Sequence, residues 1–132
     1  KIVPIAASLE AELATLPEKE RGEFLSGLGL NGSGLERVVA AGYRLLDLVT
    51  FFTVKGSETR AWTVRRGATV SEAAGRIHSD MEKGFIRAEV VSFDDLSREG
   101  SMAALRESGH LRTEGRDYEV QEGDVVLIHF HV

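Results

Sequence analysis

Two strand-like runs enclose a clearly marked helix in the middle of this chain, and that order limits the possible folds most. The first run covers residues 59–64 and leads into a basic turn. Thr69 and Glu72 then have the spacing of a capping box, which predicts a single helix that Gly84 ends. Apolar and polar residues alternate again over residues 86–93. We therefore expect a small sheet with a helix across one face.

Three further runs complete the strand order of a β-grasp, or ubiquitin-like, sheet. The predicted strands cover residues 48–54, 59–64, 86–93, 118–120 and 125–130. A hairpin loop at residues 55–57 joins the first two strands. Residues 94–110 form an acidic connection with one helix expected at about residues 101–107. This order predicts an α+β fold of the β-grasp type. It consists of two strands, a helix, a strand, a connection and two more strands.

The first 47 residues have a different, mainly helical pattern. The expected elements are a strand end at residues 2–6, a helix capped by Ser8 that ends near Leu13, and a helix over residues 18–26. Ser33 and Glu36 form a second capping box, and helical spacing continues from there to about Leu46. We expect a domain boundary at this point, with one part at residues 1–47 and a second domain at residues 48–132.

Composition favours a globular intracellular protein. The 132 residues include no cysteine, which excludes disulfides and thiolate metal sites and favours the reducing cytoplasm. We find no apolar run of about 18 residues and no signal peptide, so we expect no membrane partner. The first residue is Lys rather than Met, which suggests a chain entered in the middle. The net charge of −5 argues against general coating of nucleic acid.

The sequence offers no complete nucleotide site or catalytic centre. Residues 27–32 match G-x-G-x-x-G, but a predicted helix precedes them where the fingerprint needs a strand, so we interpret them as a glycine-rich helix end. No phosphate loop of the type G-x-x-x-x-G-K-[ST] occurs. We therefore predict no catalytic residues and expect the chain to be inactive as an enzyme alone.

Histidine and tryptophan positions each allow two interpretations. His129 and His131 lie two apart on the last predicted strand, where a metal pair and two ordinary strand histidines are both possible; we expect no metal. His78 lies late on a helix and has three candidate roles, which are to pair with Asp80, to bind a phosphate or to favour the negative end of the helix. Trp62 either stacks on a base or belongs to the core.

Basic residues concentrate in the middle of the chain and predict an RNA contact. Between residues 54 and 92 basic residues outnumber acidic ones, against the overall balance. The candidates for phosphate contacts are Arg60, Arg65, Arg66, His78, Lys83 and Arg87. We expect these side chains to gather on one face, while a mixed solvated surface is the alternative.

Long stretches of the sequence resemble one family, the YchF-type (Obg-like) ATPases of the translation-factor GTPase class. The resemblance covers about residues 2–132, and residues 48–132 resemble a TGS domain, a β-grasp module. The matching stretches include Gly42-Tyr43-Arg44-Leu45-Leu46, Thr50-Phe51-Phe52-Thr53, Arg60-Ala61-Trp62-Thr63, Glu82-Lys83-Gly84-Phe85-Ile86-Arg87-Ala88-Glu89-Val90 and Asp117-Tyr118-Glu119-Val120-Gln121-Glu122-Gly123-Asp124-Val125.

The resemblance implies a C-terminal fragment of a ribosome-associated ATPase. The parent would bind ATP or GTP with Mg²⁺ through a nucleotide domain that precedes this segment, and this chain alone would hold no cofactor. The family usually has Ser-Ala-Lys near the purine base, and this chain has Ala6, Ala7 and Ser8 there. The resemblance therefore implies a contact to the base through the backbone, because a backbone contact tolerates a change of side chain. The implied partners are the ribosome or ribosomal RNA and the parent's own nucleotide domain. The alternative is a protein–protein or intramolecular regulatory module without RNA contact.

Overall fold

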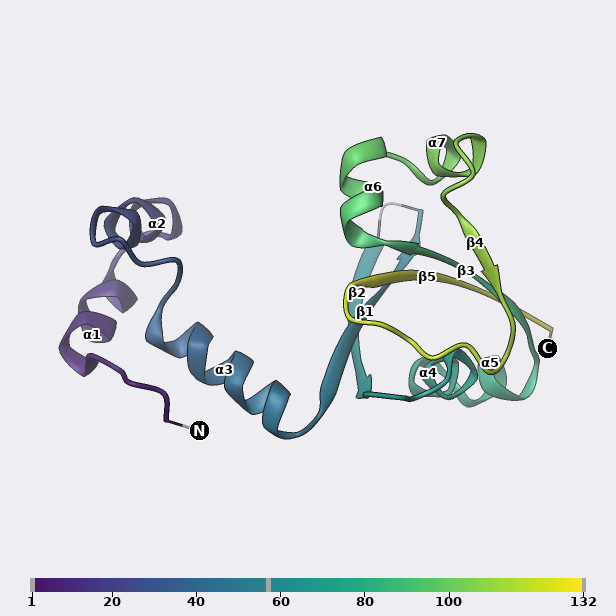
Figure 1. Cartoon of the computed structure of the whole chain (residues 1–132), viewed down its shortest axis with the longest axis horizontal. Coiled ribbons are helices and arrows are strands. Elements are labelled where there is room, and N and C mark those ends of the chain that lie inside the picture. Colours follow the sequence, from purple (N-terminus) through teal and green to yellow (C-terminus); the bar gives the residue numbers. More distant parts are fainter. Residues whose placement is uncertain (1, 57, 132) are drawn as a thin grey trace. The chain divides into compact units, whose positions relative to one another are not determined.

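The structure is a computed structural model that describes residues 2–56 and 58–131. The chain divides into two compact units, the first ending at Leu46 and the second beginning at Asp47 (Figure 1). Of the hairpin loop expected at residues 55–57, Ser57 lies outside the described residues.

The first unit consists of three helices. They are α1 (Ala7–Thr15), α2 (Glu18–Gly27) and α3 (Gly34–Leu45). The capping box is confirmed, because Ser33 Oγ accepts the N–H of Glu36 at 3.1 Å and the Glu36 carboxylate accepts the N–H of Ser33 at 2.8 Å. The prediction that Ser8 caps the first helix was wrong, because α1 begins two residues earlier than such a cap allows and has Ala6 at the cap position. Residues 2–6 form no strand, since no described strand pairs with them.

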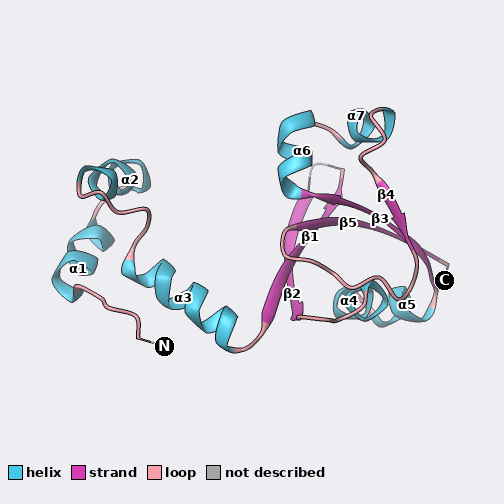
Figure 2. Ribbon diagram, viewed as in Figure 1, coloured by secondary structure: helices cyan, strands magenta, loops and turns pink. Residues whose placement is uncertain are grey.

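The second unit is built on a five-stranded mixed sheet, and the whole is of the α+β class (Figure 2). The strands are β1 (Leu48–Lys55), β2 (Glu58–Arg65), β3 (Phe85–Ser92), β4 (Arg112–Glu114) and β5 (Asp124–Phe130). Their order is β2-β1-β5-β3-β4, with β1 and β5 parallel and the other neighbours antiparallel. The last strand therefore lies in the centre, as its apolar sequence requires.

Helices cover both faces of this sheet. They are α4 (Val70–Ile77), α5 (Ser79–Lys83), α6 (Phe93–Glu99) and α7 (Met102–Glu107). In the view of Figure 1, α4 and α5 lie below the sheet and α6 and α7 above it. The lower core includes Val49, Phe51, Val64, Val70, Ala73, Ala74, Ala88, Val90, Val120 and Val126. A smaller upper core joins Val91 and Val125 to Leu105 of α7.

The single helix predicted before Gly84 is two helices. His78 has an extended backbone (φ −161°, ψ 139°), and its Nδ1 accepts the N–H of Asp80 at 3.2 Å. This side-chain bond caps α5 and competes with continuation of α4. Gly84 ends α5, as expected.

The connection before β5 also differs from the prediction. The sequence predicted one helix there, but α6 precedes the expected α7 and begins where Ser92 Oγ accepts the N–H of Asp95 at 3.1 Å. Residues 118–120 contribute an isolated bridge between Thr69 and Glu119 rather than a strand, and the paired residues lie earlier, in β4. Short pairings of this kind depend on tertiary neighbours more than on propensity.

Candidate nucleic-acid interface

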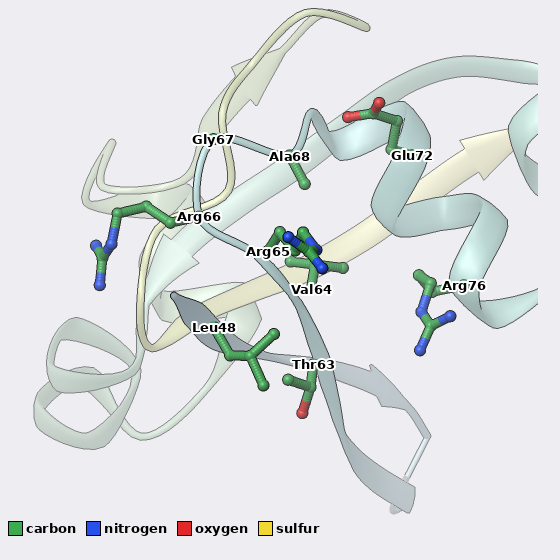
Figure 3. Close-up of a pocket in the computed structure, with 9 residues that line it drawn as sticks. All are labelled: Leu48, Thr63, Val64, Arg65, Arg66, Gly67, Ala68, Glu72 and Arg76. Atoms are coloured by element: carbon green, nitrogen blue, oxygen red, sulfur yellow. The ribbon is translucent and has the colours of Figure 1, made fainter. Parts of the chain in front are cut away.

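The turn that follows β2 forms an open basic pocket at the edge of the sheet. Gly67 has φ 83°, a left-handed conformation that suits glycine. The N–H of Arg66 donates to the carbonyl of Asp47 at 2.8 Å, and its Nε lies 3.0 Å from Asp47 Oδ1. These bonds fix the turn beside the start of β1. The pocket has a volume of about 600 Å³ and is lined by Leu48, Thr63, Val64, Arg65, Arg66, Gly67, Ala68, Glu72 and Arg76 (Figure 3).

The guanidinium groups of Arg65 and Arg76 carry positive charge that no described acid neutralises. Both residues are exposed, and the structure records no ion pair for either among the described residues. Glu72 is the acid among the residues that line the pocket, but its Oε2 accepts the N–H and the hydroxyl of Thr69 at 2.7 and 3.1 Å. Figure 3 shows its carboxylate at the start of α4, away from the Arg76 guanidinium. The pocket is therefore suited to bind an anion such as a phosphate group.

The other predicted contact residues do not join this pocket. On β2, Arg60 shares the α4 side of the sheet with Trp62, and its guanidinium lies 2.7 Å from the Glu58 carboxylate. Arg87 is exposed on the opposite side of the sheet, because it alternates with the buried Ala88 of the lower core. The structure therefore does not gather the six residues on one face, as the sequence led us to expect.

His78 and Lys83 belong to the short helix α5. His78 is the N-cap residue of α5, and its Nδ1 also lies 3.5 Å from the Asp80 carboxylate. Lys83 is exposed at the other end of the helix. Arg76, by contrast, was missed. It stands four residues after Glu72 on α4, so the two exposed residues share one face of the helix, and that helical spacing was the available signal.

The predicted nucleotide contact lies at the start of α1. Ala6, Ala7 and Ser8 are exposed, and no side chain caps this helix end. Backbone N–H groups in a first helical turn have no acceptor within the helix. Those of Ala7 and Ser8 are therefore open to acceptors outside the helix. The segment has no cationic side chain for the phosphates of ATP or GTP and no carboxylate for Mg²⁺.

No cluster of three histidine or acidic side chains in the described part of the chain is arranged to hold a metal. His129 Nε2 lies 3.5 Å from the Glu89 carboxylate, which also accepts a bond from Arg106 at 2.9 Å. His131 lies beyond the end of β5. Across residues 2–56 and 58–131, none of the helices combines the length and apolar character needed to cross a bilayer.

A buried polar group holds the start of β5. Asp124 is 3% exposed and accepts the hydroxyl of Tyr118 at 2.8 Å and the N–H of Gln121 at 2.9 Å. Burial raises the pKa of Tyr118, and its hydrogen bond to Asp124 raises it further. Partial burial lowers the pKa of Arg112. The hydrogen bond to Tyr118 and the nearby carboxylates of Asp124 and Glu114 together have the larger effect, so the pKa is raised.

Known proteins share both the sequence and the fold of this chain. It is 49% identical over 131 residues to "Ribosome-binding ATPase YchF" of Escherichia coli O157:H7, which covers 99% of this chain and 36% of that protein. It is 46% identical to the protein of the same name from Bacillus subtilis (100% and 36%) and 41% identical to "Obg-like ATPase 1" of Rattus norvegicus (98% and 33%). The chain thus spans about a third of the length of these relatives.

A solved structure agrees with these matches. The YchF GTPase of Schizosaccharomyces pombe superposes with a TM-score of 0.85 at 32% identity, covering 98% of this chain and 34% of that chain. Residues 48–131 match the family YchF-GTPase_C, described as "Protein of unknown function (DUF933)". The chain therefore belongs to the family of C-terminal YchF GTPase domains.

Proposed function

We propose that this chain is the C-terminal part of a ribosome-binding ATPase and that its second unit is a TGS domain that docks on ribosomal RNA. The sheet order β2-β1-β5-β3-β4, with α4 between β2 and β3, supports a β-grasp assignment. The names of the relatives support the ribosome as partner. A ribosome-bound protein works in the cytoplasm, which is where we place it.

The single observation that carries the RNA contact is the unneutralised pair Arg65 and Arg76 beside Arg66. Two free guanidinium groups around one open pocket complement the charge of a nucleic-acid backbone better than isolated surface charges do. The net charge of −5 restricts such contacts to a local surface. We therefore assign phosphate binding first to this pocket, and give Arg60, His78, Lys83 and Arg87 a smaller part.

Charge reversal in the pocket tests this proposal. The variant Arg65→Glu/Arg76→Glu should bind purified ribosomes at least tenfold more weakly in co-sedimentation. The slope of log K against log salt should become shallower by about two units, since each lost phosphate contact removes about one.

Lys19→Glu/Arg37→Glu is the matched control, because it makes the same change in net charge on the first unit. It should leave binding within twofold of the unmodified chain. Binding that ignores salt, or that survives reversal of Arg65 and Arg76, would favour the alternative of a protein–protein or intramolecular module.

We further propose that the first unit, about residues 1–47, is the end of the parent's nucleotide-binding domain. Its α3 exposes one apolar face, with Leu35 66% and Val39 51% accessible, which is unusual for a complete domain. In that parent, Ala6, Ala7 and Ser8 would contact the base through backbone N–H groups. ATP or GTP with Mg²⁺, and the hydrolysis chemistry they bring, would be held by residues outside this chain.

A further inference from the structure

The two central parallel strands separate after a short contact. β1 pairs with β5 at Phe52–Val125 and Thr53–Val126, whereas β5 continues beside β3 as far as Phe130. Figure 2 shows the β1–β2 hairpin turning away from the course of β5. Beyond Val126, no described strand flanks the β1 side of β5. Backbone N–H and C=O groups on that side therefore lack strand partners.

Two pockets open on either side of this gap. Both are lined by Val54 and Lys55 of β1 and by Val126 and Leu127 of β5. The pocket on the α4 side has a volume of about 440 Å³ and adds the apolar residues Trp62, Ile77, Met81, Ile128 and Phe130 and the polar residues Thr53, Glu58 and Arg60. The pocket on the other side has a volume of about 340 Å³ and adds Gly56, Met102 and Val125. We call the gap with its two pockets the β1–β5 cleft.

The walls of the β1–β5 cleft are apolar and held in place. Trp62 Nε1 donates to Thr53 Oγ1 at 2.9 Å, which fixes the indole across the hairpin. The guanidinium of Arg60 lines the α4-side pocket but is paired with Glu58. The remaining charge at the rim is Lys55, which is exposed and has no recorded partner among the described residues. The cleft thus combines an open strand edge, two apolar pockets and one free positive charge.

We propose that the β1–β5 cleft binds an extended peptide segment of a partner protein, which adds a strand beside β5 beyond Val126. Successive side chains of a strand point to opposite faces, so consecutive apolar residues would fill the two pockets in turn. An acidic residue at the end near Lys55 would complement its charge. A nucleic acid lacks the backbone N–H groups that an open strand edge selects. The proposal does not rest on the RNA contact, because it uses none of Arg65, Arg66 and Arg76.

The test is selection of random heptapeptides displayed on phage against the full 132-residue chain. Selected peptides should carry three consecutive apolar residues next to Asp or Glu. Each should shift the fluorescence of Trp62, the sole tryptophan of the sequence. N-methylation of alternate peptide amides should weaken binding at least tenfold in one register and less than twofold in the other, because just one set of amides faces β5.

Two variants examine the site itself. Val54→Arg introduces a charge into the apolar wall that both pockets share and should weaken the selected peptides at least tenfold. Lys55→Glu, at an exposed position, should weaken them at least fivefold. Lys19→Glu is the matched control and should leave affinity unchanged. Thermal unfolding of each variant checks that the fold persists.

Several outcomes would overturn the proposal. They are selected peptides without the apolar and acidic pattern, equal binding to Lys55→Glu, or equal loss of affinity from N-methylation in both registers. Displacement of the peptides by single-stranded RNA with the same Trp62 shift would assign the cleft to nucleic acid instead. Because Arg65→Glu/Arg76→Glu leaves the cleft intact, failure of either proposal is distinguishable from failure of the other.

Discussion

Asp124 shows how one buried charge fixes the position of a central strand. It lies at the start of β5 and receives bonds from Tyr118 and Gln121, and Arg112 lies 3.8 Å from its carboxylate. A buried carboxylate without such partners would destabilise the fold by several kcal/mol. These bonds therefore connect the loop before β5 to the first residue of that strand.

Removal of the Tyr118 hydroxyl is expected to lower stability and to change its dependence on pH. Tyr118→Phe should reduce the free energy of unfolding by about 1–2 kcal/mol in urea titrations near neutral pH. The raised pKa of Tyr118 means that its contribution is complete below the ordinary tyrosine value of about 10 and is lost as pH rises through the folded value. The variant should lack that alkaline loss. Equal alkaline behaviour in both proteins would contradict the assignment.

The basic pocket was only partly visible in the sequence. Arg65 and Arg66 precede Gly67 in a turn, where exposure follows from local signals alone. Arg76 joins them because α4 packs against β2, and no local sequence pattern predicts that packing. The neutralisation of Arg60 by Glu58 likewise depends on the side-chain rotamers of two residues on the same face of β2. The residue types were enough to predict a phosphate contact. Which of these residues lie together could be seen only in the three-dimensional fold.

Helix ends explain which elements could be predicted. The capping boxes at Ser33 and Thr69 place both helix starts at the expected residues. The start of α6 has the related signal of Ser92 followed by Asp95, but the acidic run after it resembled a solvated loop. β4 has three residues, too few for an alternation pattern, so its pairing with β3 comes from tertiary packing.

The cap of α6 offers a second prediction. Ser92→Ala should reduce the free energy of unfolding by about 1 kcal/mol, because the N–H of Asp95 loses its acceptor. The Ser92 hydroxyl also donates to the Asp95 carboxylate at 2.6 Å and holds the pKa of Asp95 below its ordinary value. In the variant, NMR titration should show that pKa rising toward the ordinary value.

Ser97→Ala provides the control for this prediction. Ser97 is exposed within α6, so its removal should leave the pKa of Asp95 unchanged. In the unmodified chain the contribution of Asp95 is present above its ordinary pKa and is lost as pH falls through the lower folded value. An unchanged pKa in Ser92→Ala would show that Arg98 rather than Ser92 controls this carboxylate.

At the scale of the whole molecule, the two units differ in how much apolar surface they bury. In the described part of the first unit, Leu13 and Leu25 are the buried large apolar side chains, while Leu45 of α3 is 86% exposed. The second unit encloses two cores around its sheet. Regions with few buried apolar contacts open at lower free energy than the core of a domain.

Limited digestion with trypsin should therefore remove the first unit before the second is cut. Cleavage is expected first after Lys19, Arg21, Arg37 or Arg44, which are in the first unit. A fragment that begins just before β1 should persist and should be identified by mass spectrometry. Simultaneous loss of both units at all protease concentrations would show that they unfold together.

The central place of β5 has a consequence for synthesis. The two halves of the sheet, β1–β2 and β3–β4, emerge earlier in the chain but meet each other only through β5. Pairings between distant segments form late, because the intervening chain must be ordered first. A nascent chain would therefore carry two unjoined strand pairs until β5 leaves the exit tunnel, and the strand edges that β5 later covers would be open during that interval.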